Sequence, residues 1–256
     1  MAQDNSQRES AKTLAQCYTG PFAAADPPAM TISPPSEAIP AAELLDPHAL
    51  AQLLGRFGKG YAEQDIRGVA SQWSKWYFAA VLVPALLADL LLRRELPLAL
   101  ERLFLLLTDD GRVERLCLGD TGRSLPGAVG GQRFIALLDD NLAPLIEALS
   151  MLSGASPRVF WSNAGNVFEN ILNQLEQHPD ADPGATEPAR HLLERSCLTD
   201  GRRNPLYRPV RYVTQPDGTT SRQRRLCCIR YLIPELDYCG NCPLTHRPAR
   251  VCRSGR

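Results

Sequence analysis

The spacing of apolar residues divides the chain into amphipathic helices and short apolar strands. Asp46-Pro47 is a helix cap followed by a proline at the first helical position, and the apolar residues after it share one face. This predicts a helix that ends near residues 58–60. A second helix is predicted over roughly residues 66–94, with a kink or a break at Pro84. Because its apolar run contains Pro84 and Asp89 and falls short of the ~20 apolar residues of a membrane span, we expect a buried core helix.

Two β-hairpins are predicted from short runs that are separated by turn residues. The first spans residues 103–118 and turns at Asp-Asp-Gly, and the second spans residues 209–231 and turns at Pro-Asp-Gly. The second hairpin places Cys227 and Cys228 on its returning strand. Between the hairpins the pattern predicts a helix over 134–152 with Pro144 inside it, a strand at 159–161, a helix capped by Ser162-Asn163, and a helix over 187–197.

Together these elements predict an α+β fold with a mostly helical body, two hairpins and a C-terminal cysteine site. Residues 1–42 are rich in Ala, Pro, Ser and Asp without a helical period, which predicts a flexible N-terminal arm. We expect the helical body and the first hairpin over residues 43–203, and the metal-binding region over residues 204–256. The Gly-rich stretch 119–131 lacks both phosphate-binding glycine motifs, so it does not predict a nucleotide site.

Composition is that of an ordinary globular protein, but charge is divided unevenly along the chain. Hydrophobic residues make up 44% and charged residues 22%, which excludes wholesale disorder and fibrous architectures. The first residues lack the apolar core of a secretory signal, so we expect a cytoplasmic protein with reduced cysteines. Residues 201–256 hold twelve arginines against three acidic residues, a balance of +9 in a chain of net charge zero. Such an end attracts anionic chelates, acidic proteins, nucleic acid or anionic lipid.

Four of the eight cysteines follow the pattern C-C-x10-C-x2-C, at Cys227, Cys228, Cys239 and Cys242. In a reducing compartment this spacing indicates a metal site rather than disulfides. Thiolates select zinc, cuprous copper or iron–sulfur clusters. One tetrahedral zinc fits adjacent cysteines poorly, because neighbours on a strand point to opposite faces, whereas a two-iron cluster tolerates a wider spread of sulfurs. Spacing therefore predicts a metal and leaves zinc and iron open.

The other cysteines are not expected to bind metal. Cys17, Cys117 and Cys197 stand alone in the sequence, which is typical of small buried hydrophobic residues. Cys252 and His246 lie close enough to the motif to replace a ligand. Their setting near the C-terminus favours an unligated thiol and a surface histidine.

The segment from Arg224 through Cys242 resembles the C-terminal signature of the FhuF-type ferric siderophore reductases. Three upstream segments resemble that family in the same order, Gln72–Tyr77, Trp161–Gly165 and Asn204–Arg208. The resemblance covers about residues 44–244 and implies that the four cysteines of the motif hold a 2Fe-2S cluster. Trp73, Trp76 and Trp161 within these segments are expected to be core aromatics.

The resemblance implies a cytoplasmic reductase that acts on ferric siderophores of the hydroxamate type. Oxygen ligands hold ferric iron tightly and ferrous iron far more weakly, so one electron would release the metal. The sequence shows no nicotinamide or flavin signature, and we therefore expect an electron-donor protein such as a ferredoxin or a flavodoxin. The basic end could also contact the inner membrane peripherally.

Four arginines bracket the first cysteine pair: Arg222, Arg224, Arg225 and Arg230. They could dock an acidic donor or an anionic chelate and would favour the reduced cluster, or they could form a solvated basic strand face. Two other functions stay open. One is a zinc-stabilised nucleic-acid-binding module, although the resemblance argues against nucleic acid, and the other is a 2Fe-2S sensor without reductase activity.

Overall fold

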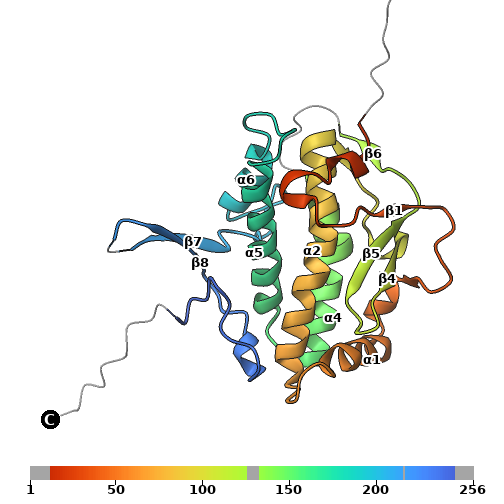
Figure 1. The fold of residues 1–256 in the computed structure, drawn as a ribbon, viewed down its shortest axis with the longest axis vertical. Coiled ribbons are helices and arrows are strands. Elements are labelled where there is room, and N and C mark those ends of the chain that lie inside the picture. The colour runs from red at the N-terminus through yellow and green to blue at the C-terminus, as the bar shows by residue number, and fades with distance from the viewer. Residues whose placement is uncertain (1–11, 126–132, 216, 246–256) are drawn as a thin grey trace, which may run out of the picture.

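The computed structural model describes residues 12–125, 133–215 and 217–245. Long helices form its centre, a small sheet lies on one side of them, and a two-stranded hairpin projects on the other (Figure 1). The fold is α+β, as the sequence predicts.

Helix α2 (Ile66–Leu92) is the central element. The carboxylate of Asp65 accepts a hydrogen bond from the backbone N–H of Arg67 and caps the helix, which ends at Arg93 in a left-handed conformation (φ 52°). The helix continues through the buried Pro84 as one element, so of the two predicted outcomes, a kink or a break, the break does not occur. By length and composition α2 could cross a membrane, but 56% of its apolar window is buried inside the fold, as expected of a core helix.

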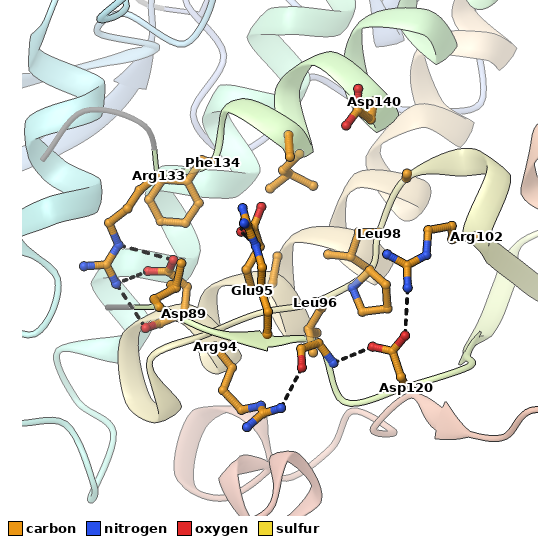
Figure 2. A pocket seen from close by; sticks show the side chains of 18 of the residues that line it. Asp89, Arg94, Glu95, Leu96, Leu98, Arg102, Asp120, Arg133, Phe134 and Asp140 are labelled. Atoms are coloured by element: carbon orange, nitrogen blue, oxygen red, sulfur yellow. Dashed lines mark hydrogen bonds and ion pairs between the residues drawn. The ribbon is translucent and has the colours of Figure 1, made fainter. Parts of the chain in front are cut away.

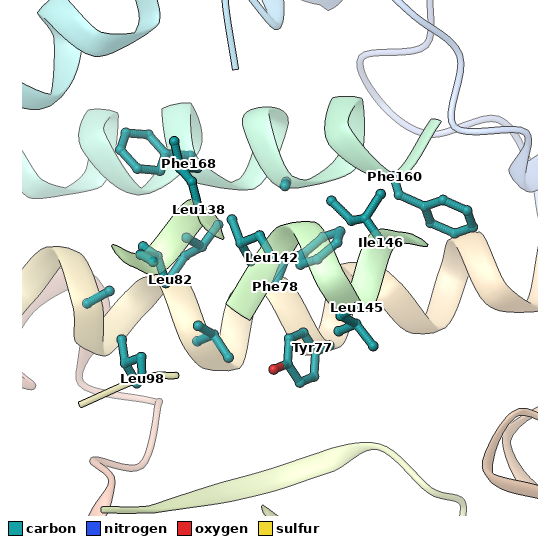
Figure 3. Packing of buried hydrophobic residues seen from close by; sticks show 14 of the residues in the cluster. Tyr77, Phe78, Leu82, Leu98, Leu138, Leu142, Leu145, Ile146, Phe160 and Phe168 are labelled. Atoms are coloured by element: carbon teal, nitrogen blue, oxygen red, sulfur yellow. The ribbon is translucent and has the colours of Figure 1, made fainter. Parts of the chain in front are cut away.

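Three helices pack against α2: α1 (Pro47–Gly58), α4 (Ala143–Ser153) and α5 (Pro157–Leu175). The predicted start of α1 is confirmed, since the Asp46 carboxylate accepts a hydrogen bond from the backbone N–H of Ala49 at 2.8 Å. The core lies where the helices meet. Figure 3 shows the buried side chains there, Tyr77, Phe78 and Leu82 from α2, Leu138, Leu142, Leu145 and Ile146 around the start of α4, and Phe160 and Phe168 from α5.

A small sheet covers the other side of the core in the strand order β1-β5-β4-β2. Its strands are β1 (Ala29–Met30), β2 (Ile39–Pro40), β4 (Leu103–Leu107) and β5 (Val113–Leu118). Strands β4 and β5 are antiparallel and form the first predicted hairpin, which turns at Gly111 with φ 81°. A separate pair joins β3 (Arg94–Glu95) to β6 (Arg123–Ser124).

The prediction of a flexible arm over residues 1–42 is wrong for its described part, residues 12–42. Strand β1 pairs in parallel with β5, and β2 pairs antiparallel with β4. Cys17 and Phe22 are buried in the body, and Lys12 forms an ion pair with Asp180. The segment has no helical period because it attaches through two-residue strands and single turns, which leave no period in a sequence.

Residues 135–153 are helical almost throughout, as predicted. They comprise α3 (Ile135–Leu137), one π-helical turn η5 (Leu138–Leu142) and α4, which ends at Gly154 with φ 71°. The π turn immediately precedes the segment that contains Pro144, where a regular N–H bond is missing.

Residues 159–161 were predicted as a strand, and the structure shows that this is wrong. They belong to helix α5 (Pro157–Leu175), which is capped by Ser156 rather than by Ser162-Asn163. The valine and aromatic residues favour a strand locally, but burying Phe160 against α2 requires the helix. Tertiary packing therefore outweighs local propensity here.

The second hairpin forms from β7 (Val210–Thr214) and β8 (Thr220–Arg224), although Pro216 of its turn lies outside the described residues. It was predicted to run on to residue 231, and this is wrong. The backbone N–H of Arg225 still donates to the carbonyl of Pro209 at 3.0 Å, and the pairing ends there, before the adjacent cysteines.

Short elements complete the described chain: α6 (Glu187–Glu194), and the 3-10 turns η1 (Leu14–Cys17), η2 (Gly20–Phe22), η3 (Ala41–Leu45), η4 (Leu100–Arg102) and η6 (Arg230–Leu232).

Candidate metal centre

Residues 225–245, called here the cysteine loop, lie against α2 and α5 and bring the four cysteines of the motif together. The Sγ atoms of Cys228 and Cys239 are 3.8 Å apart. The thiol of Cys227 hydrogen-bonds with that of Cys228 and interacts electrostatically with Cys242. Cys228 and Cys242 are buried, each 1% exposed, whereas Cys227 and Cys239 are partly exposed. The group therefore has a buried side and an open side.

The backbone of the loop is shaped around sulfur. The N–H of Ile229 donates to Cys227 Sγ at 3.3 Å, and the N–H of Leu244 donates to Cys242 Sγ at 3.4 Å. Ile229 has φ 51°, a left-handed conformation that turns the chain directly after the adjacent pair. The N–H of Cys242 closes a tight turn on the carbonyl of Cys239 at 2.9 Å. The adjacent pair thus lies in a turn, and the strand geometry assumed from the sequence does not apply.

A buried polar network fixes the cysteine loop to the helices. Ser71 Oγ on α2 donates to the carbonyl of Cys228 at 2.5 Å. Asn163 Nδ2 on α5 donates to Ser71 Oγ and to Ser74 Oγ, each at 3.0 Å. The same amide accepts a hydrogen bond at its Oδ1 from Arg224 Nη2 at 2.5 Å. Two helices, the end of β8 and the loop therefore share one buried hydrogen-bond network.

Two glycines allow the helices to approach this region closely. A Cβ on Gly68 of α2 would lie 3.1 Å from Leu232 Cβ and 3.0 Å from Ile233 Cγ1. A Cβ on Gly165 of α5 would lie 2.7 Å from Pro209 Cβ, closer than real contacts allow. Larger residues at these positions would push the cysteine loop and the hairpin away from the helices.

Two cations face the thiols from the buried side. Lys75 Nζ on α2 donates to Cys228 Sγ at 3.2 Å and to Gln72 Oε1 at 2.9 Å. Arg224 is 1% exposed, and its Nε finds no hydrogen-bond partner among the described residues. Burial lowers the pKa of both cations, and the nearby cysteine thiolates oppose that shift. Lys75 bonds a cysteine sulfur directly, whereas the guanidinium of Arg224 is held by Ser162 and Asn163 and acts on the thiols through its charge.

Three of the thiols, those of Cys227, Cys228 and Cys239, differ in pKa because of these neighbours. Hydrogen bonds with Cys227 and then with Cys239 lower the pKa of Cys228, and Lys75 and Arg224 act in the same direction. The hydrogen bond with Cys228 raises the pKa of Cys227 and that of Cys239. Among these three, Cys228 is the one whose neighbours favour the thiolate, the form that binds metal.

The arginines around the pair do not form one basic face. Arg222 Nε donates to Glu169 Oε2 at 2.5 Å, and Arg224 is enclosed, so neither is free to dock a partner. Arg230 is partly buried, and its Nε also has no partner among the described residues. Arg225 is exposed. The expectation of a shared docking or solvated surface is thus wrong for two of the four.

These residues fit an iron–sulfur cluster. The donor set consists of soft thiolates, and the cations and N–H groups around it suit a negatively charged sulfur-rich group. Among the described residues, no three His, Cys, Asp or Glu side chains converge on one metal-ion position. A 2Fe-2S cluster is held at two iron atoms rather than at one point.

The isolated cysteines lie elsewhere. Cys17 and Cys117 are buried, as predicted, whereas Cys197 is exposed, so its predicted burial is wrong. Cys252 and His246 lie outside the described residues.

The sequence motifs contain site residues whose roles were not recognised. Ser71 precedes the segment Gln72–Tyr77, which contains Lys75, and Asn163 belongs to the segment Trp161–Gly165. The signal that could have found them is a polar residue inside an otherwise apolar helix.

The tryptophans of these segments differ from one another. Trp73 is buried, as predicted, and its Nε1 donates to the carbonyl of Gly111 at 2.9 Å. Trp161 is partly buried against the core. Trp76 is 46% exposed and lies under the guanidinium of Arg112 at 5.1 Å, so the core prediction is wrong for it.

A cavity of about 760 Å³ lies near the other end of α2 (Figure 2). Four arginines and four acidic residues line it: Arg94, Arg102, Arg123, Arg133, Asp89, Glu95, Asp120 and Asp140. Asp89 lies about four turns beyond Lys75, roughly 20 Å along the helix axis. Although a large cavity is the usual first candidate for a site, its described lining holds no cysteine and its charges are matched. We therefore place the chemistry at the cysteine loop.

Comparisons with known proteins agree with this placement. A family model described as a ferric iron reductase FhuF-like transporter matches residues 71–220, and one described as a FhuF 2Fe-2S C-terminal domain matches residues 224–244. The ferric siderophore reductase of Escherichia coli (strain K12) is 28% identical over 219 residues, which covers 82% of this chain and 80% of that protein. The second match spans all four cysteines, so the cysteine loop carries a 2Fe-2S cluster and the zinc alternative is set aside.

Proposed function

We propose, because the chain belongs to the FhuF-like family of ferric iron reductases, that it releases iron from ferric siderophores by reducing it. The observation that carries this proposal is the cysteine loop, where the buried Arg224 and the partly buried Lys75 face four thiols within a segment that matches a 2Fe-2S domain. A similar protein bears the name ferric siderophore reductase.

We propose Cys227, Cys228, Cys239 and Cys242 as the cluster ligands. When bound, the cluster supplies one electron at a time. The chain supplies the thiolates, backbone N–H groups that donate to Cys227 and Cys242, and the cations that offset negative charge at Cys228. Ser71 and Asn163 hold the loop against the helices, so that the ligands keep their places when the charge of the site changes.

The proposed substrate is a ferric complex of the hydroxamate type. Its oxygen ligands hold ferric iron tightly and ferrous iron weakly, so a single electron is sufficient to free the metal. The partly exposed cysteines, Cys227 and Cys239, mark the side on which a bulky chelate can approach. A chelate of this kind does not need to enter a deep pocket.

The proposed electron donor is a small acidic protein such as a ferredoxin or a flavodoxin. The sequence has no signature for nicotinamide or flavin binding, so the electron must come from another carrier. Arg225 is exposed beside the open side of the loop and can attract an acidic partner. We place the reaction in the cytoplasm, with the basic C-terminal end of the sequence available for peripheral contact with the inner membrane.

Anaerobic purification followed by rapid mixing tests the proposal. The chain should be red-brown, with iron and sulfide in equal amounts. After reduction, mixing with a ferric trihydroxamate and a ferrous trap should reoxidise the cluster and release trapped ferrous iron at matching rates. The Cys228→Ser variant serves as the inactive control.

Two results would contradict the proposal. A colourless chain that holds zinc would exclude any reductase of this type. A chain with an intact cluster that reduces no ferric chelate above the rate of the control would instead indicate a sensor.

A further inference from the structure

Lysine is rare in this chain, and one of its few lysines is at the metal centre. The sequence contains three lysines and 25 arginines. Lys59 is exposed after α1, and Lys12 is partly exposed in its ion pair with Asp180. Lys75 alone among the three places its ammonium against a cysteine. A chain that otherwise uses arginine has a lysine where a cation meets sulfur.

The surroundings of Lys75 give its ammonium few other partners. Nζ lies 3.2 Å from Cys228 Sγ and 2.9 Å from Gln72 Oε1, one turn back on α2. In the described part of the chain it forms no ion pair with a carboxylate, and the charged groups that act on it are Cys228, Cys239 and Arg224. Its charge is therefore balanced by sulfur alone.

The choice of lysine fits this position physically. An ammonium is a compact charge with three donors, so it can bond one sulfur and one amide oxygen at once from a narrow buried space. A guanidinium is broad and planar and suits paired oxygens rather than a single sulfur. Gln72 fixes the direction of the ammonium, so its charge stays at Cys228 rather than turning to solvent.

We propose that Lys75, held by Gln72, sets the reduction potential of the cluster through its N–H to Cys228 Sγ. A positive charge and a hydrogen bond at a ligand sulfur both stabilise the state that carries the extra electron. Lys75 is thus a positioning and tuning residue rather than one that touches the substrate. The inference rests on the proposal that Cys228 is a cluster ligand.

The test is a redox titration of the cluster-loaded protein with Lys75→Met beside wild type. Methionine keeps much of the side-chain volume and removes the charge and the donors. The equilibrium constant for reduction of the cluster should fall at least tenfold, which corresponds to a shift of 59 mV to lower potential for one electron. Resonance Raman spectra should lose the deuterium-sensitive shift of an iron–sulfur stretch that an N–H donor produces. Lys59→Met, which removes an exposed lysine, should change neither reading.

If Lys75 had only a structural role, the substitution would change the stability of the protein and leave the reduction potential of the cluster unchanged. Lys75→Met with full iron and sulfide and an unchanged potential would overturn the proposal. If that variant does not load the cluster, Lys75→Gln replaces it. Its amide can still donate to sulfur but carries no charge, so the potential should still fall, by less than the tenfold change, and an unchanged potential would show that the ammonium charge plays no part and would overturn the proposal.

The same titration separates this inference from the proposed function. A wild-type protein that reduces no ferric chelate, together with a potential that falls in Lys75→Met, would contradict the reductase and leave the role of Lys75 intact.

Discussion

The charged side chains at the two ends of α2 have different kinds of partner. At the cavity end, Arg133 pairs with Asp89, Arg123 pairs with Glu95, and other arginines bind nearby acids or carbonyls. At the cysteine end, Lys75 and Arg224 face sulfur, and neither forms an ion pair with a carboxylate in the described chain. Three arginines at the cavity end are therefore paired with carboxylates, whereas the cysteine end holds one buried and one partly buried cation that face the cysteine group.

This difference shows which end is prepared for a ligand. A buried charge is costly unless it is paired, so a cavity whose charged side chains are paired is stable without a bound ligand. An unmatched pair of cations is stable only beside an anionic group, and a cluster held by four thiolates is such a group. Charge balance therefore locates the functional end better than cavity volume does.

The largest effect is expected from Cys228, the buried proposed ligand that Lys75 contacts. Cys228→Ser should lower the affinity for iron by more than about 100-fold, because losing even a partner that only supports a ligand costs up to that factor. Iron and sulfide analysis with visible spectra measures this. Cys117→Ser, equally buried in the sheet, should keep the cluster. An unchanged spectrum in Cys228→Ser would remove this residue from the ligand set.

At the cavity end, Arg133→Gln should cost about 3 kcal/mol of unfolding free energy at pH 7, because it leaves the buried Asp89 carboxylate without its partner. Burial already raises the pKa of Asp89 above its ordinary value. The folded state therefore favours the neutral carboxyl, and stability is lost as pH rises through the folded pKa. The deficit of the variant should shrink as the pH is lowered.

Urea unfolding at several pH values measures this change, and iron analysis provides the comparison between the two ends. The folded variant should keep its full cluster content. Loss of iron from folded Arg133→Gln would show that the two ends are coupled and would break the contrast between them.

A smaller loss of stability is expected from Arg224→Met, about 2 kcal/mol in the loaded protein. The change removes a charged hydrogen bond to Asn163 Oδ1 and leaves that buried acceptor without its donor. Urea unfolding measures it. Arg158→Met, exposed on α5, should stay within about 0.5 kcal/mol of wild type. Equal stability of the Arg224 variant and wild type would show that Arg224 does not hold the loop.

The smallest effect is expected from Arg225→Gln. Because this side chain is exposed and screened by salt, its loss should slow reduction by an acidic ferredoxin or flavodoxin by no more than about threefold, and only at low ionic strength. Stopped-flow reduction across a salt series measures this. Arg56→Gln, exposed on α1, is the matched control. Identical salt dependence in both variants would leave Arg225 without a role in docking.

The sequence predicted those features that depend on neighbouring residues. The cap at Asp46-Pro47, the first hairpin with its turn at Gly111 and the cysteine motif all carry local signals, and the structure places the helix, hairpin and loop accordingly. The strand predicted at 159–161 was wrong, because contact with α2 decides its conformation. The attachment of residues 12–42 was missed because two-residue strands leave no periodicity.

The inner side of the metal centre could not be predicted from local pattern. Lys75 and Cys228 are 153 residues apart, and Ser71 and Asn163 are 92 apart, so no window of sequence contains either pair. In sequence, Arg224 looks like part of a basic run, and only the packing of β8 on α5 shows that it is enclosed. Whether a polar residue is buried depends on the topology of the fold, which a local stretch of sequence does not show directly.

The distance between Lys75 and Cys228 along the chain also determines the order in which the parts of the metal centre are synthesised. The ribosome adds the intervening 153 residues in about 8 to 30 s, which is long compared with the folding of helices. Helices α2 and α5 are complete before the first cysteine of the motif is made. Until then, Lys75 lies on a surface that the nascent chain has not yet covered. Cofactor insertion therefore follows synthesis of the helical body, and a chain cut before Cys227 would contain α2 and α5 but none of the four proposed ligands.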